Sequence, residues 1–121
     1  FSPDGQQIAI ADDFKVRILN ASTGKKEKNF KTPSAINSIA FSPKGNRLAV
    51  GLDDGVVRII RLDGDNHISF GFDGPGVNAV SFSSDGTKIA VGYEKGMVRI
   101  IDEEGKIIRS FDRGNDHNEA I

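Results

Sequence analysis

Short apolar runs and short polar turns alternate through the middle of the chain. The apolar runs cover residues 36–41, 48–52 and 56–60. Each run is too short for a stable helix and is rich in β-branched and aliphatic residues. Pro43 and Gly45 in the first turn, and Gly55 in the second, favour tight reversals of the chain. With a fourth, more polar run at residues 66–70, the pattern predicts a four-stranded antiparallel meander, and the unalternating run 48–52 indicates a strand covered on both faces.

The same pattern is written three times along the chain. An FSPDG-type turn begins at Phe1, Phe41 and Phe82, so the period is about forty residues. Each turn is followed by an apolar strand (IAIA, LAVG or IAVG) and then by a strand that contains VRIL or VRII. Four antiparallel strands in a repeat of this length are typical of a β-propeller blade.

These turns and strands resemble those of the WD-repeat family of β-propellers, and the resemblance covers the whole chain. Several family features are absent. In place of the usual Trp-Asp pair, the third strands end in Leu19-Asn20, Ile60-Arg61 and Ile101-Asp102. The Gly-His pair is missing, and the small hydroxyl residue of the second strand is replaced by Ile10, Val50 and Val91. The resemblance implies an all-β fold in which apolar packing replaces most of the family's hydrogen-bonded tetrad.

The resemblance also implies the domain organisation. We expect one β-propeller segment of three four-stranded antiparallel blades over residues 1–121, with repeats at approximately 1–40, 41–81 and 82–121. Residues 1–5 match the end of a first strand and the turn that follows it. Residues 117–121 align with the start of a first strand in the other repeats.

Three blades leave one apolar sheet face uncovered at each end. Propellers close with about four to eight blades, and each uncovered aliphatic side chain forfeits ~1.5–3 kcal/mol of burial. We therefore expect this segment to be part of a larger closed ring. Further blades of a longer parent chain or a homo-oligomer would close it, and the start at Phe1 instead of methionine favours the longer parent.

Composition argues against several classes of function. With 16 basic and 17 acidic residues the net charge is −1, which argues against nucleic acid or an anionic membrane as a partner. There is no cysteine, so neither a disulfide framework nor a thiolate metal site is possible. No apolar run approaches the ~20 residues of a membrane span and no signal peptide is visible, and we expect the cytoplasm over secretion. His67 and His117 occupy unrelated positions in their repeats. We expect no catalytic residue, no cofactor and no metal site.

Acidic turns between the second and third strands form the candidate interaction surface. In a propeller these turns share a rim with the links between blades, and exposed aromatic residues beside them could anchor a basic segment of another protein. The simpler interpretation is that aspartate is a good turn residue. Neighbouring members of this surface are Asp12, Asp53 and Phe72. The candidate partner-binding rim consists of Asp13, Phe14, Asp54, Tyr93 and Glu94.

Arg17, Arg58 and Arg99 recur on the third strands. A basic stripe for phosphate or acidic peptides is one interpretation. The repeat itself favours another, in which each arginine lays its stem on the neighbouring blade and pairs with an acid.

The resemblance implies a non-catalytic scaffold for contacts with other proteins or peptides. Two alternatives are the propeller portion of a hydrolase or peptidase and a designed, self-assembling repeat protein. No GxSxG motif in this chain supports the hydrolase.

Overall fold

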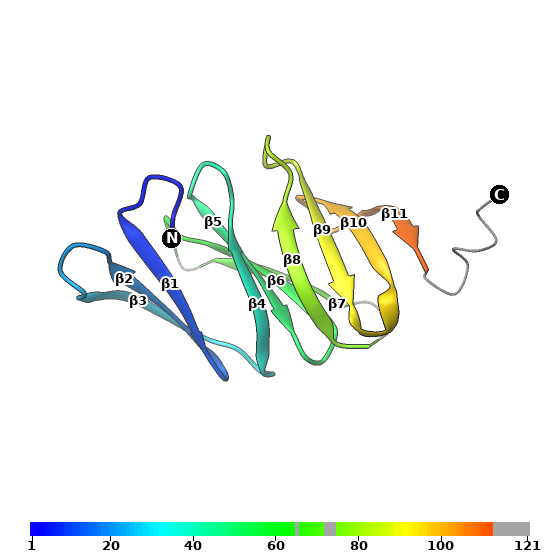
Figure 1. Ribbon diagram of the computed structural model, residues 1–121, viewed down its shortest axis with the longest axis horizontal. Coiled ribbons are helices and arrows are strands. Elements are labelled where there is room, and N and C mark those ends of the chain that lie inside the picture. Colours follow the sequence, from blue (N-terminus) through cyan, green and yellow to red (C-terminus); the bar gives the residue numbers. More distant parts are fainter. Residues whose placement is uncertain (65, 72–74, 113–121) are drawn as a thin grey trace.

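The computed structural model describes residues 1–64, 66–71 and 75–112 (Figure 1). These residues form β-strands and one short 3-10 helix, η1 (Glu94–Gly96), so the prediction of an all-β fold is confirmed. The strands are β1 (Gln7–Asp12), β2 (Lys15–Asn20), β3 (Lys26–Lys31), β4 (Ile36–Phe41), β5 (Arg47–Leu52), β6 (Val56–Arg61), β7 (His67–Gly71), β8 (Val77–Phe82), β9 (Lys88–Tyr93), β10 (Val98–Asp102) and β11 (Ile107–Phe111).

The strands pair into three antiparallel meanders. The first sheet has the order β1-β2-β3, the second β4-β5-β6-β7 and the third β8-β9-β10-β11. The second and third sheets therefore have the four strands that the sequence predicts. The first sheet has three strands in the described part of the chain. Residues 1–6 form a turn and not a strand, so β1 pairs with β2 alone.

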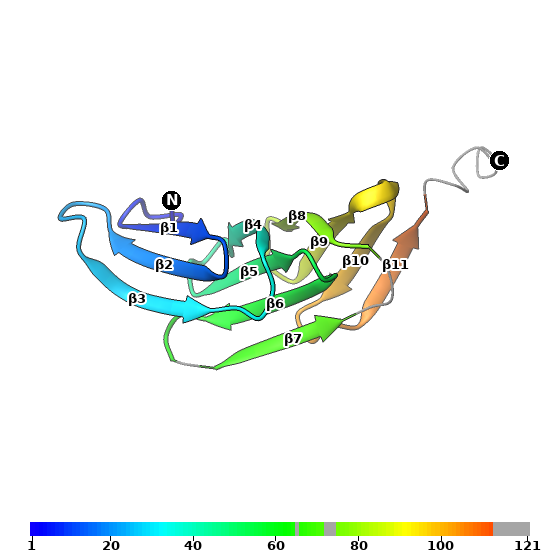
Figure 2. The same ribbon diagram turned by 90° about the horizontal axis from the view of Figure 1, so that it is seen from below.

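The three sheets lie side by side and fan out into an arc (Figure 1). Figure 2 shows β1, β4 and β8 along one side of this arc and β3, β7 and β11 along the opposite, outer side. Turns between first and second strands lie at the upper edge of Figure 1, and turns between second and third strands lie at the lower edge. This is the blade arrangement of a β-propeller segment.

One serine in each repeat builds the turn ahead of the second strand. The backbone N–H of Arg47 donates to Oγ of Ser42 (3.0 Å), and the N–H of Gly45 donates to the carbonyl of Ser42 (2.8 Å). The same pair of hydrogen bonds recurs at Ser2 and Ser83. Gly45 has a φ of 77°, in the left-handed region that favours glycine. The FSPDG-type motif is therefore a structural turn.

Two apolar clusters hold the arc together, one at each junction between sheets. The first cluster joins Val16 and Ile18 to Leu48, Val50, Leu52 and Ile60. The second cluster joins Ala49, Val57 and Ile59 to Val77, Val80, Ile89, Val91, Tyr93 and Ile101. Strand β5 contributes to both clusters, since Leu48 and Val50 belong to one and Ala49 to the other, and all three are fully buried. The prediction of a strand covered on both faces at residues 48–52 is confirmed.

Some predictions fall on residues that the structure does not describe. Phe72, His117 and the strand expected at residues 117–121 lie outside the described residues.

Candidate functional site

The turns between second and third strands lie against the links between sheets, as the propeller arrangement predicts. The N–H of Ile36 donates to the carbonyl of Asp13 (2.8 Å), and the N–H of Asp53 donates to the carbonyl of Ala35 (2.8 Å). In the third sheet the N–H of Glu94 donates to the carbonyl of Gly76 (3.0 Å). Backbone hydrogen bonds thus fix each turn to a link between sheets. The first turn is bonded to the link that leads into the second sheet, and the other two are each bonded to the link that precedes their own sheet. We call the edge that carries Asp12, Asp13, Asp53, Asp54 and Glu94 the acidic rim.

Asp13 and Phe14 form the most open part of the acidic rim. Asp13 has a φ of 50°, a left-handed conformation that aspartate tolerates better than most residues. The tight turn pushes Phe14 outward, where 55% of its surface is exposed. Phe14 lines an open hollow of about 300 Å³. Its lining residues are Asp12, Asp13, Phe14, Lys15, Lys31 and Thr32.

Asp53 and Asp54 are turn residues with local hydrogen-bond partners. Oδ1 of Asp54 accepts the backbone N–H of Val56 (3.1 Å), and Oδ1 of Asp53 accepts the side-chain amide of Asn37 (3.2 Å). The same amide of Asn37 donates to the carbonyl of Val77 in the next sheet (2.9 Å). The structural interpretation of these aspartates therefore holds, and the outer carboxylate oxygens still lie at the exposed rim.

Tyr93 does not belong to the exposed rim, which corrects the prediction made for it. Its ring belongs to the apolar cluster between the second and third sheets and is only 3% exposed. Alternation along β9 turns Ile89, Val91 and Tyr93 to the same face, and that face is the covered one. Glu94 follows it on η1 and is exposed. Of the predicted rim residues, Asp13 and Phe14 share one hollow, while Asp54 and Glu94 lie on the two following turns.

The third-strand arginines are structural, but each in a different way. Arg17 pairs with Asp12 at 3.3 Å in its own sheet, and both side chains are about half exposed. Arg58 donates to Oγ of Ser69 (3.2 Å) and to the carbonyl of Lys31 in the preceding sheet (3.1 Å). The guanidinium of Arg99 lies 5.1 Å from the centre of the Tyr93 ring. Arg17 therefore has the predicted acidic partner.

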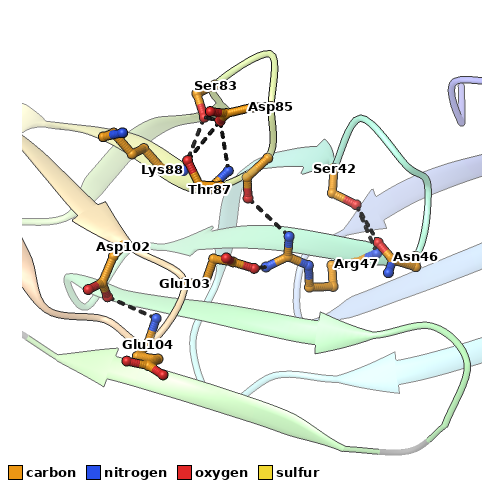
Figure 3. Close-up of polar contacts among 11 residues, drawn as sticks. Ser42, Asn46, Arg47, Ser83, Asp85, Thr87, Lys88, Asp102, Glu103 and Glu104 are labelled. Atoms are coloured by element: carbon orange, nitrogen blue, oxygen red, sulfur yellow. Dashed lines mark hydrogen bonds and ion pairs between the residues drawn. The ribbon is translucent and has the colours of Figure 1, made fainter.

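A larger polar site lies on the opposite edge, between the second and third sheets (Figure 3). Arg47 of β5 reaches across the junction: its Nη1 lies 2.9 Å from Oε1 of Glu103, and its Nη2 donates to the carbonyl of Gly86 (3.0 Å). Its guanidinium also lies 5.4 Å from the centre of the Phe82 ring. A groove of about 580 Å³ opens beside it, flanked by Ile68 of β7. The sequence alone does not reveal this site, because its members come from separate repeats and the two charged residues, Arg47 and Glu103, do not recur at the equivalent positions of the other repeats.

Hydrogen bonds at this edge stabilise the charged form of Asp85. The backbone N–H of Thr87 (3.0 Å), Oγ of Ser83 (2.7 Å) and Oγ1 of Thr87 (2.8 Å) all donate to Oδ1 of Asp85. These donors, with the Thr87 backbone first, hold the pKa of Asp85 well below its usual value. The carboxylate is thus a fixed part of the turn.

Comparison with known families agrees with this geometry. Residues 24–61 match the family model for the WD domain, G-beta repeat. Residues 61–121, half of the chain, match the model for the WD40 domain of anaphase-promoting complex subunit 4. The chain belongs to the WD40-repeat family. No curated protein matches it.

WD40 domains generally act as scaffolds for contacts with other proteins. In this WD40 chain, apolar packing replaces much of the family's polar network. Val50 and Val91, at the position of the usual small hydroxyl residue, are fully buried between sheets. Ile10 at the same position of the first sheet is 41% exposed, because no sheet covers that face in the described part of the chain.

The described residues were searched for groups of side chains that could hold a metal ion. Within residues 1–64, 66–71 and 75–112, no group of three or more histidine, cysteine or acidic side chains could hold a metal ion. His67 is exposed at the start of β7. No helix in the described ranges is long and apolar enough to cross a membrane.

Proposed function

We propose that this WD40 segment is a non-catalytic scaffold whose acidic rim binds a basic, extended segment of a partner protein. The observation that carries the proposal is the exposed ring of Phe14, which lines a hollow together with Asp12 and Asp13. A large aromatic side chain that is held by a rigid turn loses little entropy on binding, and such residues dominate protein interfaces. The carboxylates beside it and along the rim select for a basic partner.

The charges of the rim suit a segment with spaced basic residues. Asp53, Asp54 and Glu94 extend the negative charge from the Phe14 hollow along the two following turns. Lys15 and Lys31 line the hollow itself. We therefore propose that an apolar residue of the partner packs on Phe14 and that basic residues on either side of it contact the carboxylates.

We further propose that residues 1–121 form a single propeller segment with repeats near 1–40, 41–81 and 82–121, as part of a closed ring. The first and third sheets each present one face with no sheet against it in the described residues. Further blades of a longer chain, or a second copy, would cover these faces.

Fluorescence anisotropy with two labelled synthetic peptides tests the rim. One peptide alternates lysine with leucine and the other alternates glutamate with leucine, so the two share their apolar residues. The lysine peptide binds more tightly, and its affinity falls as salt is added. Phe14→Ser weakens binding of the lysine peptide about tenfold.

Reversing the charge of the acidic rim gives a more stringent test in the same experiment. The triple variant Asp13→Lys, Asp54→Lys, Glu94→Lys exchanges the preference, so that the glutamate peptide becomes the tighter ligand. Ile68→Ser, an exposed residue on β7 away from the rim, leaves both affinities unchanged. Equal binding of both peptides by the unmodified chain and the triple variant would refute the proposal.

A further inference from the structure

The repeat gives every sheet two chemically distinct faces. The pairing registers define equivalent positions: Ala9 lies opposite Ile18, Ala49 opposite Ile59, and Ala90 opposite Ile100. Together with Val16, Val57 and Val98 these residues form what we call the forward face. The second set of pairs is Ile8 with Leu19, Leu48 with Ile60, and Ile89 with Ile101. Together with Ile10, Val50 and Val91 these residues form the backward face.

Both junctions in the structure join a forward face to a backward face. At the first junction Val16 and Ile18 of the forward face pack against Leu48, Val50 and Ile60. At the second junction Val57 and Ile59 pack against Ile89, Val91 and Ile101. The two junctions therefore use the same contact, with valine and isoleucine of a forward face packed against aliphatic residues of a backward face.

Within the described residues, one face of each kind has no sheet against it at the ends of the arc. Val98, on the forward face of the third sheet, is 36% exposed, whereas Val16 and Val57 are 0% exposed. Ile10, on the backward face of the first sheet, is 41% exposed, whereas Val50 and Val91 are 0% exposed. The two uncovered faces are therefore the two complementary halves of the contact that the chain already makes twice.

We propose that these faces bind each other between two copies of the chain, head to tail, so that the forward face of one third sheet packs against the backward face of another first sheet. The proposal deepens the proposed function, because it names a second copy as the occupant of the uncovered faces. The contact is heterologous, and using both ends closes two copies into a ring within the range of known propellers.

The rim end of the backward face fits this arrangement. Asp12 stands where the second sheet has Leu52, and its ion pair with Arg17 (3.3 Å) holds the charge at the exposed end of the strand. Arg17 occupies the position of Arg58, which donates to a carbonyl of the preceding sheet across the first junction. In the proposed contact between two copies, Arg17 is therefore placed to donate a hydrogen bond to a backbone carbonyl of the other copy's third sheet.

Sedimentation velocity on the 121-residue chain tests the contact. The mass rises above 13.0 kDa with increasing concentration. Ile10→Lys destroys the backward face and Val98→Lys destroys the forward face, so each variant alone forms no assembly larger than a weak dimer and associates at least about tenfold less tightly. Both positions are exposed, and circular dichroism confirms that the sheets are retained.

Mixing the two variants is decisive, because each keeps the face that the other has lost. An equimolar mixture forms a heterodimer, an outcome that a symmetric contact between identical faces cannot give. Ile68→Lys, on neither end face, associates like the unmodified chain. An unmodified chain that stays at 13.0 kDa overturns the proposal and leaves a further sheet of the same polypeptide as the occupant. A mixture without heterodimer overturns it as well.

The test is separate from that of the acidic rim. Phe14 lies on neither end face, so Phe14→Ser weakens binding of the lysine peptide about tenfold and leaves association intact. Loss of one property with retention of the other identifies which proposal has failed.

Discussion

Val77 fills the space that a side chain at Gly51 would need. A Cβ added to Gly51 would lie 2.5 Å from Cγ1 of Val77 and 3.3 Å from Cγ1 of Val80, both in the next sheet. Gly92 is the equivalent residue of the third sheet, and a Cβ there would meet nothing closer than Ala79 of its own sheet, at 3.9 Å. The equivalent glycines thus differ in their surroundings: Gly51 is enclosed at a junction between sheets, whereas Gly92 has free space around it at the end of the arc.

This pair gives a matched prediction for stability. Gly51→Ala forces the second and third sheets apart and lowers the free energy of unfolding by about 1–3 kcal/mol. Gly92→Ala has room for its methyl group and changes the free energy of unfolding by less than ~0.5 kcal/mol. Urea denaturation of both variants at low protein concentration provides the measurement. Equal losses in the two variants would show that the sheets do not pack as described.

Arg47 provides a second prediction at the same junction. Its side chain is 15% exposed and contacts the third sheet through Gly86, Phe82 and Glu103. Arg47→Ala therefore lowers the free energy of unfolding by about 2 kcal/mol, through the lost hydrogen bond to Gly86 and the lost packing on Phe82.

Two milder variants separate the contributions of Arg47. Glu103 is 47% exposed, so Glu103→Gln costs less than ~1 kcal/mol. Arg47→Lys keeps the positive charge but loses the planar guanidinium group. Its loss in free energy of unfolding is therefore smaller than that of Arg47→Ala and larger than that of Glu103→Gln. Thermal or urea unfolding gives the ranking, and a Glu103→Gln loss as large as that of Arg47→Ala would mean that the ion pair is the main contribution.

The carboxyl group of Asp85 makes the free energy of unfolding depend on pH. Its pKa is lowered in the folded chain by the donors on Thr87 and Ser83, so folding favours the carboxylate. The resulting stabilisation is complete above the unfolded pKa and is lost as the pH falls from about 4 toward the lower folded pKa. Asp85→Asn is consequently less stable than the unmodified chain at pH 7, and the difference narrows steadily below about pH 4.

Urea denaturation at several pH values measures that difference. Thr87→Val, which removes one hydroxyl donor but keeps the backbone N–H, shows the same trend with a smaller amplitude. A stability difference between Asp85→Asn and the unmodified chain that is the same at pH 2 and pH 7 would contradict the assignment.

The fold could be predicted from the sequence because its information is local and repeated. The serine–glycine turns and the short β-branched strands are each specified within a few residues, and the period then orders the strands into sheets. The first sheet has three strands in the described residues because residues 1–6 form the turn that precedes β1.

The candidate site could be predicted only in part. Asp13 and Phe14 lie at the rim because a tight turn exposes them. Tyr93 was placed wrongly because its exposure depends on the strand register: it shares the covered face of β9 with Val91. Arg47 was missed because a contact between repeats leaves no mark in either repeat alone.

Amide hydrogen exchange on the Ile10→Lys variant, chosen to weaken the proposed head-to-tail association, tests most directly whether the chain is stabilised by sheets packed face to face. Strands β5 and β6 are covered on both faces, whereas β2 and β10 have only one covered face each. The account predicts that amides of β5 and β6 exchange most slowly and that protection falls toward both ends of the arc. Protection as high in β2 and β10 as in β5 and β6 would contradict it.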